Sequence, residues 1–318
     1  MSLKTNRFFV VFKWIVMLAA YGYLIYQLAN IECWNELKRS FLNLNFIRIV
    51  FLVAIVLLMP VNWMLEARKW QILTSNATRL SFLISIKSVL AGLNTGYITP
   101  NRIGEFAGRI LFLPENNRWT GVLLSLINSL TQNIVMTVFG AIGAVFYFSR
   151  FYTDMNYSGY LTGIGIGIAL CIVLYFSFPG IIRKMKTNKW SVKLQEATKS
   201  MASFDTKSLF SVLLISMLRY GIFCLQFYLM LLFFGIGVSA FQAFIAIPTM
   251  YLLVTYTPSF AASEPAIRGS FAVLIFSVFS PNSIGIMLTG VLIWLINFVI
   301  PMLAGSIIVL KTKPGNPL

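Results

Sequence analysis

The chain has 318 residues, of which 58% are hydrophobic and only 11% are charged, and its mean hydropathy is +0.82. Soluble domains carry about 25% charged residues, so this composition excludes a water-soluble domain. The 25 Lys and Arg outnumber the 9 Asp and Glu, which favours an anionic membrane surface over nucleic acid as the partner. Histidine is absent and the three cysteines lie far apart, so we expect no metal, no cofactor and no histidine-dependent catalysis.

Six apolar stretches are long enough to cross a bilayer, whose apolar core of about 30 Å takes about 20 helical residues. They are residues 8–29, 46–65, 119–149, 159–180, 208–234 and 284–310. The first stretch is too long for the apolar core of a signal peptide, so we expect it to remain as a span.

Two further apolar stretches are shorter and interrupted. Residues 82–98 run into Thr99-Pro100, and residues 242–256 run into Thr257-Pro258. Each continues as a second short apolar arm, to about Leu113 and Phe279 respectively. The predicted fold is therefore an all-α polytopic membrane protein with about six full spans and two broken re-entrant helical hairpins.

The two halves of this single membrane domain, residues 1–318, have the same order of elements. Residues 8–149 and residues 159–310 each contain span, span, hairpin and span, and the second half starts from the opposite side of the membrane. The hairpins also share a pattern, which is Thr99-Pro100, Glu105 and Arg109 in the first and Thr257-Pro258, Glu264 and Arg268 in the second. This predicts an inverted-topology repeat, in which paired breaks are typical of a binding site at the membrane midplane.

Lys and Arg in the loops predict the orientation. The loop 181–207 holds seven of them, so we expect it to be cytoplasmic. Alternation across the membrane places Arg68 and Lys69 on the same side, together with both termini, and leaves only Lys38, Arg39 and Arg150 outside. The predicted location is a bacterial-type inner membrane.

Four arginines lie deep in the apolar segments: Arg102, Arg109, Arg219 and Arg268. A charge at this depth costs about 2.5–3.5 kcal/mol on insertion scales, so it usually faces a protein interior or a wet cavity. Glu105 precedes Arg109 by four residues and Glu264 precedes Arg268 by four, a spacing at which helical side chains pair. Four arginines against two glutamates leave two positive charges, which a phosphate-bearing ligand would compensate. The alternative is that these pairs only hold each hairpin to the bundle.

The breaks also favour an anion. Thr99 is a candidate N-cap with Pro100 at the first helical position, and Ser263, followed by Glu264 and Pro265, begins the corresponding arm of the second hairpin, after the break at Pro258. Each hairpin would direct a helix N-terminus at the middle of the membrane. Other polar residues recur at helical spacing and would either line a cavity or bond between helices: Ser125, Asn128, Ser129 and Gln132.

The segment Gly92 to Arg109 contains Pro100-x-Arg102-x-Gly104-Glu105, which resembles the P-x-R-x-G-E motif of the lysylphosphatidylglycerol synthase transmembrane family, also called flippase-like integral membrane proteins. The resemblance covers essentially the whole chain. A second family motif is only partly kept, because residues 258–264 lack its glycines. The resemblance implies the lipid-flipping half of aminoacyl-phospholipid synthases, and we expect no aminoacyl-transferase domain before the chain ends at Leu318.

Our leading hypothesis is a non-enzymatic translocase or binding protein for an anionic phospholipid or a polyprenyl-phosphate-linked lipid. Arg102, Arg109 and Arg268 would hold the headgroup with help from Arg219, while Glu105 and Glu264 would orient these arginines. A separate synthase or transferase would be a possible partner. The alternatives are a membrane-embedded transferase with one of the two glutamates as general base, and a carrier of a small solute or ion.

Overall fold

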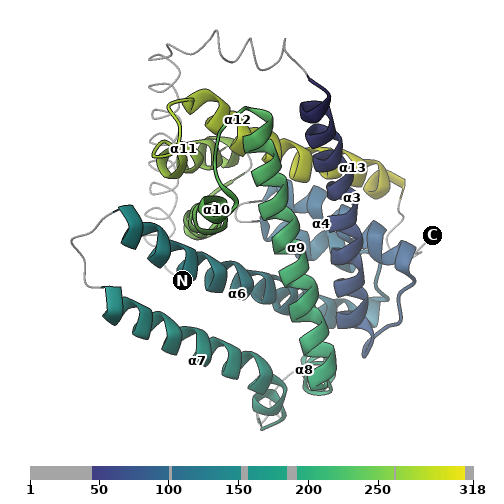
Figure 1. Cartoon of the computed structure of the whole chain (residues 1–318). Coiled ribbons are helices and arrows are strands. Elements are labelled where there is room, and N and C mark those ends of the chain that lie inside the picture. The colour runs from purple at the N-terminus through teal and green to yellow at the C-terminus, as the bar shows by residue number, and fades with distance from the viewer. Residues whose placement is uncertain (1–44, 100–101, 152–156, 185–191, 261–262, 312–318) are drawn as a thin grey trace, which may run out of the picture.

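The computed structural model describes residues 45–99, 102–151, 157–184, 192–260 and 263–311, and this part of the chain is helical without strands (Figure 1). Five helical stretches are long and apolar enough to cross a membrane: Phe46–Thr74, Glu115–Phe151, Gly159–Lys184, Thr206–Phe233 and Ser283–Leu310. They confirm five of the six predicted spans. The sixth prediction, residues 8–29, lies outside the described residues.

Four of these spans contain one long helix each, and the fifth contains three segments. The long helices are α3 (Phe46–Thr74), α6 (Arg118–Phe151), which follows the short turn η2 (Glu115–Asn117), α7 (Tyr157–Lys184) and α9 (Thr206–Phe233). The last span consists of α12 (Ser283–Trp294), the π-helical turn η3 (Leu295–Val299) and α13 (Ile300–Lys311).

Helix α3 is longer than predicted, and this corrects the location of Lys69. The helix begins after Asn45, whose side chain accepts the Arg48 backbone N–H at 2.9 Å, and continues to Thr74 instead of ending at residue 65. Lys69 is fully buried within it, while neighbouring Arg68 is exposed. The prediction of Lys69 as a cytoplasmic loop residue was therefore wrong, because Glu66 of the same helix compensates its charge and neutral acceptors of α6 and α9 take its other two donors.

The two interrupted segments form helix–break–helix units as predicted. The first consists of α4 (Phe82–Ile98) and α5 (Gly104–Ile110), and the second of α10 (Ala240–Tyr256) and α11 (Glu264–Phe276). Each first arm begins at a serine cap, Ser81 and Ser239, whose hydroxyl accepts a backbone N–H of the first turn. The prediction of two breaks in an otherwise apolar helical chain is thus correct.

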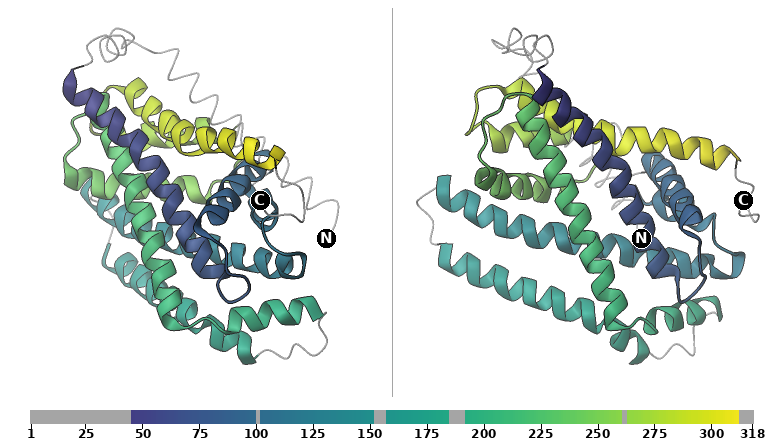
Figure 2. Two further views of the ribbon diagram at one scale, coloured as in Figure 1. Left: turned by 90° about the vertical axis from the view of Figure 1, so that its right-hand side faces the viewer. Right: turned by 45° about the vertical axis from the view of Figure 1, so that its right-hand side comes forward.

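The helices pack so that the two helix–break–helix units lie between the long helices. Helix α3 runs beside α9, α6 beside α10, α13 beside α4, and α11 beside α12 (Figures 1 and 2). Helix α7 lies at the edge of the molecule beside α6 and carries exposed apolar side chains such as Leu161, Ile166 and Val173. Such an apolar exterior is expected of a helix that faces lipid.

The predicted basic loop 181–207 contains the helix α8 (Val192–Ala202). This helix contacts α6 and α7, and Ala197 is fully buried against them. Asp205 then caps α9 by accepting the backbone N–H of Ser208 at 3.1 Å, and hydrogen bonds from the hydroxyl and the backbone N–H of Ser208 lower the pKa of its exposed carboxyl.

Candidate functional site

A cavity of about 720 Å³ lies between the two helix–break–helix units. Its wall combines side chains of α3, α5, α6, α9, α10, α11 and the turn η3. Pro258 and Ser259, in the break between α10 and α11, also line it. The predicted deep arginines, Arg102, Arg109, Arg219 and Arg268, all reach this one cavity.

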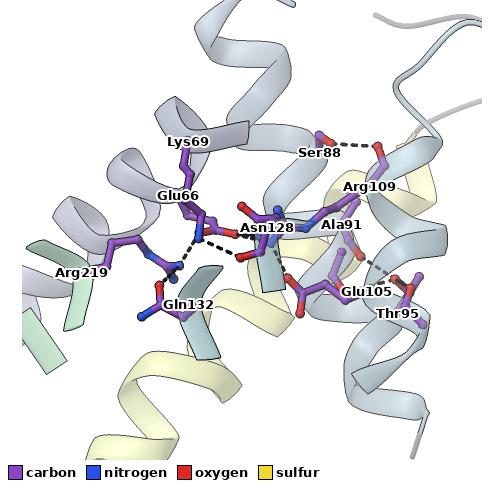
Figure 3. A network of polar contacts seen from close by, with 12 residues as sticks. Glu66, Lys69, Ser88, Ala91, Thr95, Glu105, Arg109, Asn128, Gln132 and Arg219 are labelled. Carbon is purple, nitrogen blue, oxygen red and sulfur yellow. Dashed lines mark hydrogen bonds and ion pairs between the residues drawn. The ribbon is translucent and has the colours of Figure 1, made fainter. Parts of the chain in front are cut away.

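The first charged group in the wall is centred on Glu66, which is only 3% exposed. One carboxylate oxygen accepts from Arg109 and, at 2.7 Å, from the amide of Asn128. The other oxygen pairs with Arg219 and, at 3.2 Å, with the ammonium of Lys69. Figure 3 shows Glu66 between Arg219 of α9 and Arg109 of α5. We call Glu66, Lys69, Glu105, Arg109 and Arg219 the Glu66 centre.

The contacts of Lys69 favour its charged form, because each of its donors has an acceptor. Besides Glu66, its ammonium donates to the Ser216 hydroxyl at 3.3 Å and to the Asn128 carbonyl at 3.4 Å. An ammonium has three N–H donors, and here each one meets an acceptor. Lys69 therefore contributes a full positive charge directly behind the cavity wall.

Arg109 is held by the close packing of α5 on α4. Its guanidinium also pairs with Glu105, which confirms the predicted contact between residues four apart. The Ser88 hydroxyl donates to the Arg109 carbonyl at 2.8 Å, and a Cβ atom on Gly92 would lie 2.8 Å from the Arg109 side chain. Glycine at this position of α4 therefore leaves the space that the arginine occupies.

The second charged group is centred on Glu264, at the start of α11. Arg102 donates to both of its oxygens, at 2.9 Å from Nε and 2.6 Å from Nη2, a bidentate geometry that is among the stronger ion pairs. The indole N–H of Trp294 donates to the same carboxylate at 2.8 Å. Arg268 lies farther away, at 3.9 Å. We call Arg102, Glu264 and Arg268 the Glu264 centre.

The Glu264 centre has one partner that was not predicted from the sequence. The spacing of four predicted the ion pair of Arg268 with Glu264, which is present at 3.9 Å, but Arg102, 162 residues away in the chain, makes the hydrogen bonds. Arg102 has a left-handed backbone with φ of 58°, a conformation that costs a non-glycine residue energy and is concentrated at functional sites. Its guanidinium lies 3.7 Å from the ring centre of Phe298, and that of Arg268 lies 5.0 Å from it.

The predicted caps are only partly correct. Thr99 ends α4 instead of beginning α5, and its hydroxyl accepts the Gly104 N–H at 2.7 Å. Ser263 does stand at the N-cap of α11 with Pro265 in the first turn, but its hydroxyl bonds to Phe260 because its backbone is helical. Pro100 lies outside the described residues.

Glu66, Lys69 and Phe298 are residues of the site that were not predicted from the sequence. Asn62, Glu66 and Lys69 follow one another at four and three residues along α3, so they share one face of a helix. Three polar residues on one face of an apolar segment would have indicated a buried site. The chain has 28 phenylalanines, and nothing in the sequence distinguishes Phe298 from the others.

The polar stripe of α6 contributes to the cavity as well as to helix contacts. Asn128, Ser129 and Gln132 line the cavity, and Asn128 and Gln132 also bond to Glu66 and Arg219. Ser125 is buried outside it, without a partner for its hydroxyl among the described residues. Both predicted roles of this polar stripe therefore occur together.

Several donors in the cavity wall have no hydrogen-bond acceptor among the described residues. They are Asn62 Nδ2, Trp63 Nε1, Arg109 Nη1 and Arg268 Nε, all of which are buried. A buried donor without an acceptor costs about 1–3 kcal/mol. The wall therefore favours a ligand that supplies oxygen acceptors and negative charge. Within the described part of the chain, no group of three metal-ligating side chains gathers.

The contact between Arg102 and Glu264 is expected to stabilise the fold. In a cycle of Arg102→Ala, Glu264→Ala and the double variant, the coupling energy in unfolding is expected to be about 1–3 kcal/mol, because the pair is bidentate and mostly buried. Unfolding in detergent, followed by tryptophan fluorescence, measures it. Additive effects of the two substitutions would contradict this assignment.

The fold and the site define a polytopic helical membrane protein with a charged cavity inside its helical bundle. The chain belongs to the family described as the lysylphosphatidylglycerol synthase TM region, whose model matches residues 11–305. This agrees with the resemblance seen in the sequence and indicates a lipid-related function in the membrane. No curated protein and no solved structure matches the chain.

Proposed function

We propose that this protein binds an anionic lipid or lipid-linked substrate by its headgroup and moves that headgroup across the membrane. The observation that carries the proposal is the cavity between the two helix–break–helix units, with its unpaired donors and its excess of positive charge. An anionic phospholipid and a polyprenyl-phosphate-linked lipid both have a headgroup of the required charge. The family of the chain supports a lipid substrate.

The rim of the cavity supports a lipid over a soluble solute. Leu126, Leu130 and Tyr256 line the cavity and are also 40%, 59% and 64% exposed. In a membrane these apolar side chains meet acyl chains. A headgroup can then occupy the charged interior while its tail stays in the bilayer. A small solute or ion has no tail and would not need an apolar opening toward the bilayer.

The ion pairs of the cavity favour transport over catalysis. Glu105 and Glu264 both pair with arginines, and a carboxylate held by arginine is a weak general base. In the proposed cycle the arginines pair with the headgroup instead of with their glutamates while the headgroup is bound. They pair with the glutamates again when the headgroup leaves. This exchange of partners would open the cavity first to one side and then to the other.

Two further proposals follow from the topology. We infer that the two halves form an inverted repeat in a bacterial-type inner membrane, with both termini cytoplasmic. A separate synthase or transferase would then supply or use the lipid. Cysteine labelling from each side at Arg68 and Arg150, replaced one at a time, tests the orientation, because the proposal places them on opposite sides.

The test of translocation uses Arg268→Ala in proteoliposomes. Arg268 makes no hydrogen bond among the described residues, so its loss is expected to leave the fold intact. With tail-labelled phosphatidylglycerol and cardiolipin in parallel assays and a membrane-impermeant quencher, we expect Arg268→Ala and Arg109→Ala to reduce the rate of headgroup transfer of the transported lipid at least tenfold. Arg68→Ala, an exposed arginine outside the cavity, is the matched control. Wild-type rates in both cavity variants would exclude this mechanism.

A further inference from the structure

We infer that the cavity selects a lipid that carries two phosphate groups with one negative charge on each. This inference rests on the proposed function and specifies its substrate class. Its basis is the distribution of charge between the two centres of the cavity wall.

Each centre has one positive charge in excess. The Glu66 centre contains the three cations Lys69, Arg109 and Arg219 but only the two carboxylates Glu66 and Glu105. The Glu264 centre contains two cations, Arg102 and Arg268, and one carboxylate. Among the described residues, no hydrogen bond or ion pair joins the two centres. The excess is therefore divided between two places in one cavity.

Each centre also has a buried donor without an acceptor among the described residues. In the Glu66 centre this is Arg109 Nη1, and Asn62 Nδ2 of the same cavity wall also lacks an acceptor; these two residues are 2% and 1% exposed. In the Glu264 centre it is Arg268 Nε, whose nearest carboxylate oxygen in the described part of the chain is 3.9 Å away. An uncompensated buried charge is costly, so an anion is needed at both centres.

A single phosphate does not meet this requirement. A phosphodiester such as that of phosphatidylglycerol has one charge, and a phosphomonoester concentrates about 1.5–2 charges on one phosphorus. Two phosphates with one charge each match both centres. Cardiolipin has this chemistry as two phosphodiesters, and a polyprenyl-diphosphate-linked sugar has it as a diphosphate.

Competitive lipid binding tests the inference. The purified full chain is mixed in detergent with equimolar cardiolipin, polyprenyl-diphosphate-linked sugar, phosphatidylglycerol and phosphatidic acid, and retained lipid is counted by native mass spectrometry. We expect at least one two-phosphate lipid to be retained about tenfold more than either single-phosphate lipid, because it makes a second charge-assisted contact. Cardiolipin retention would identify a phospholipid source, and sugar lipid retention a lipid-linked precursor.

Charge variants provide the second readout. Arg268→Gln removes the excess charge of the Glu264 centre, so it is expected to reduce the preference to about twofold or less, while Arg68→Gln leaves it unchanged. Equal retention of phosphatidylglycerol or phosphatidic acid by the wild type would overturn the inference and leave the proposed function standing. Retention of no lipid at all would overturn both.

Discussion

Replacing Glu66 by glutamine is expected to lower the free energy of unfolding by about 3–5 kcal/mol, the usual cost of removing one partner from a buried ion pair. Glu66 is the shared acceptor of Arg109, Arg219 and Lys69, and its side chain is 4% exposed. Glutamine keeps the shape of the side chain but leaves three cations with one carboxylate in the described part of the chain, that of Glu105. Thermal unfolding in detergent, or the yield of folded protein after extraction, measures the loss.

Glu115→Gln is the matched control for this variant. Glu115 also pairs with an arginine, Arg118, at 3.4 Å, but its side chain is 76% exposed, so its loss is expected to change stability by less than about 1 kcal/mol. Combining Glu66→Gln with Lys69→Met removes one uncompensated cation and is expected to restore part of the stability. A Glu66→Gln protein as stable as the Glu115→Gln protein would contradict the central role of Glu66.

Replacing Gly108 by alanine is expected to destabilise the protein by about 1–3 kcal/mol, the range for excess volume in a packed interior. A Cβ atom there would collide with the Thr95 hydroxyl and with the backbone of Ala91, whose carbonyl carbon would be 2.6 Å away. Because the collision is mainly with backbone of α4, α5 must move outward. That movement carries Arg109 away from Glu66, so headgroup transfer is expected to fall together with stability.

Gly163→Ala on α7 separates this steric effect from the general effect of alanine in a helix. A Cβ atom on Gly163 meets nothing within 4 Å, and alanine favours helix over glycine. Gly163→Ala is therefore expected to match or slightly exceed wild-type thermal stability, with unchanged transfer rates. Equal effects of the two substitutions would show that α5 can shift away from α4 at little cost.

Most of the helices could be predicted from the sequence, because a helix that crosses lipid must be about 20 residues long and mainly apolar. The first arm of each hairpin was predicted to within two residues, since Thr99-Pro100 and Thr257-Pro258 interrupt apolar runs that are too short to span. The predicted span ended at residue 65, before the end of α3, because charged residues such as Glu66 and Lys69 are typical of loops between spans. The burial of Glu66 depends on arginines of α5 and α9, which a local window of sequence does not contain.

The same limit applies to the site. The contact between Glu105 and Arg109 follows from local helical spacing, and the structure has it. The contact between Glu264 and Arg102 depends on a left-handed backbone at Arg102 and on how two distant hairpins pack. The predicted excess of two positive charges is correct. The set of charged residues is larger than predicted, but the two added residues, Glu66 and Lys69, have opposite charges and leave the excess unchanged.

The two centres share one feature that bears on biosynthesis. Glu66, from the first half of the chain, binds Arg219 of the second half, and Glu264, from the second half, binds Arg102 of the first. A ribosome makes Arg102 long before Glu264, so the nascent first half must enter the bilayer with an arginine whose carboxylate does not yet exist. We therefore expect that arginine to lack this partner until α11 is made, and neither half supplies all partners of its charged side chains when it is made as a separate polypeptide.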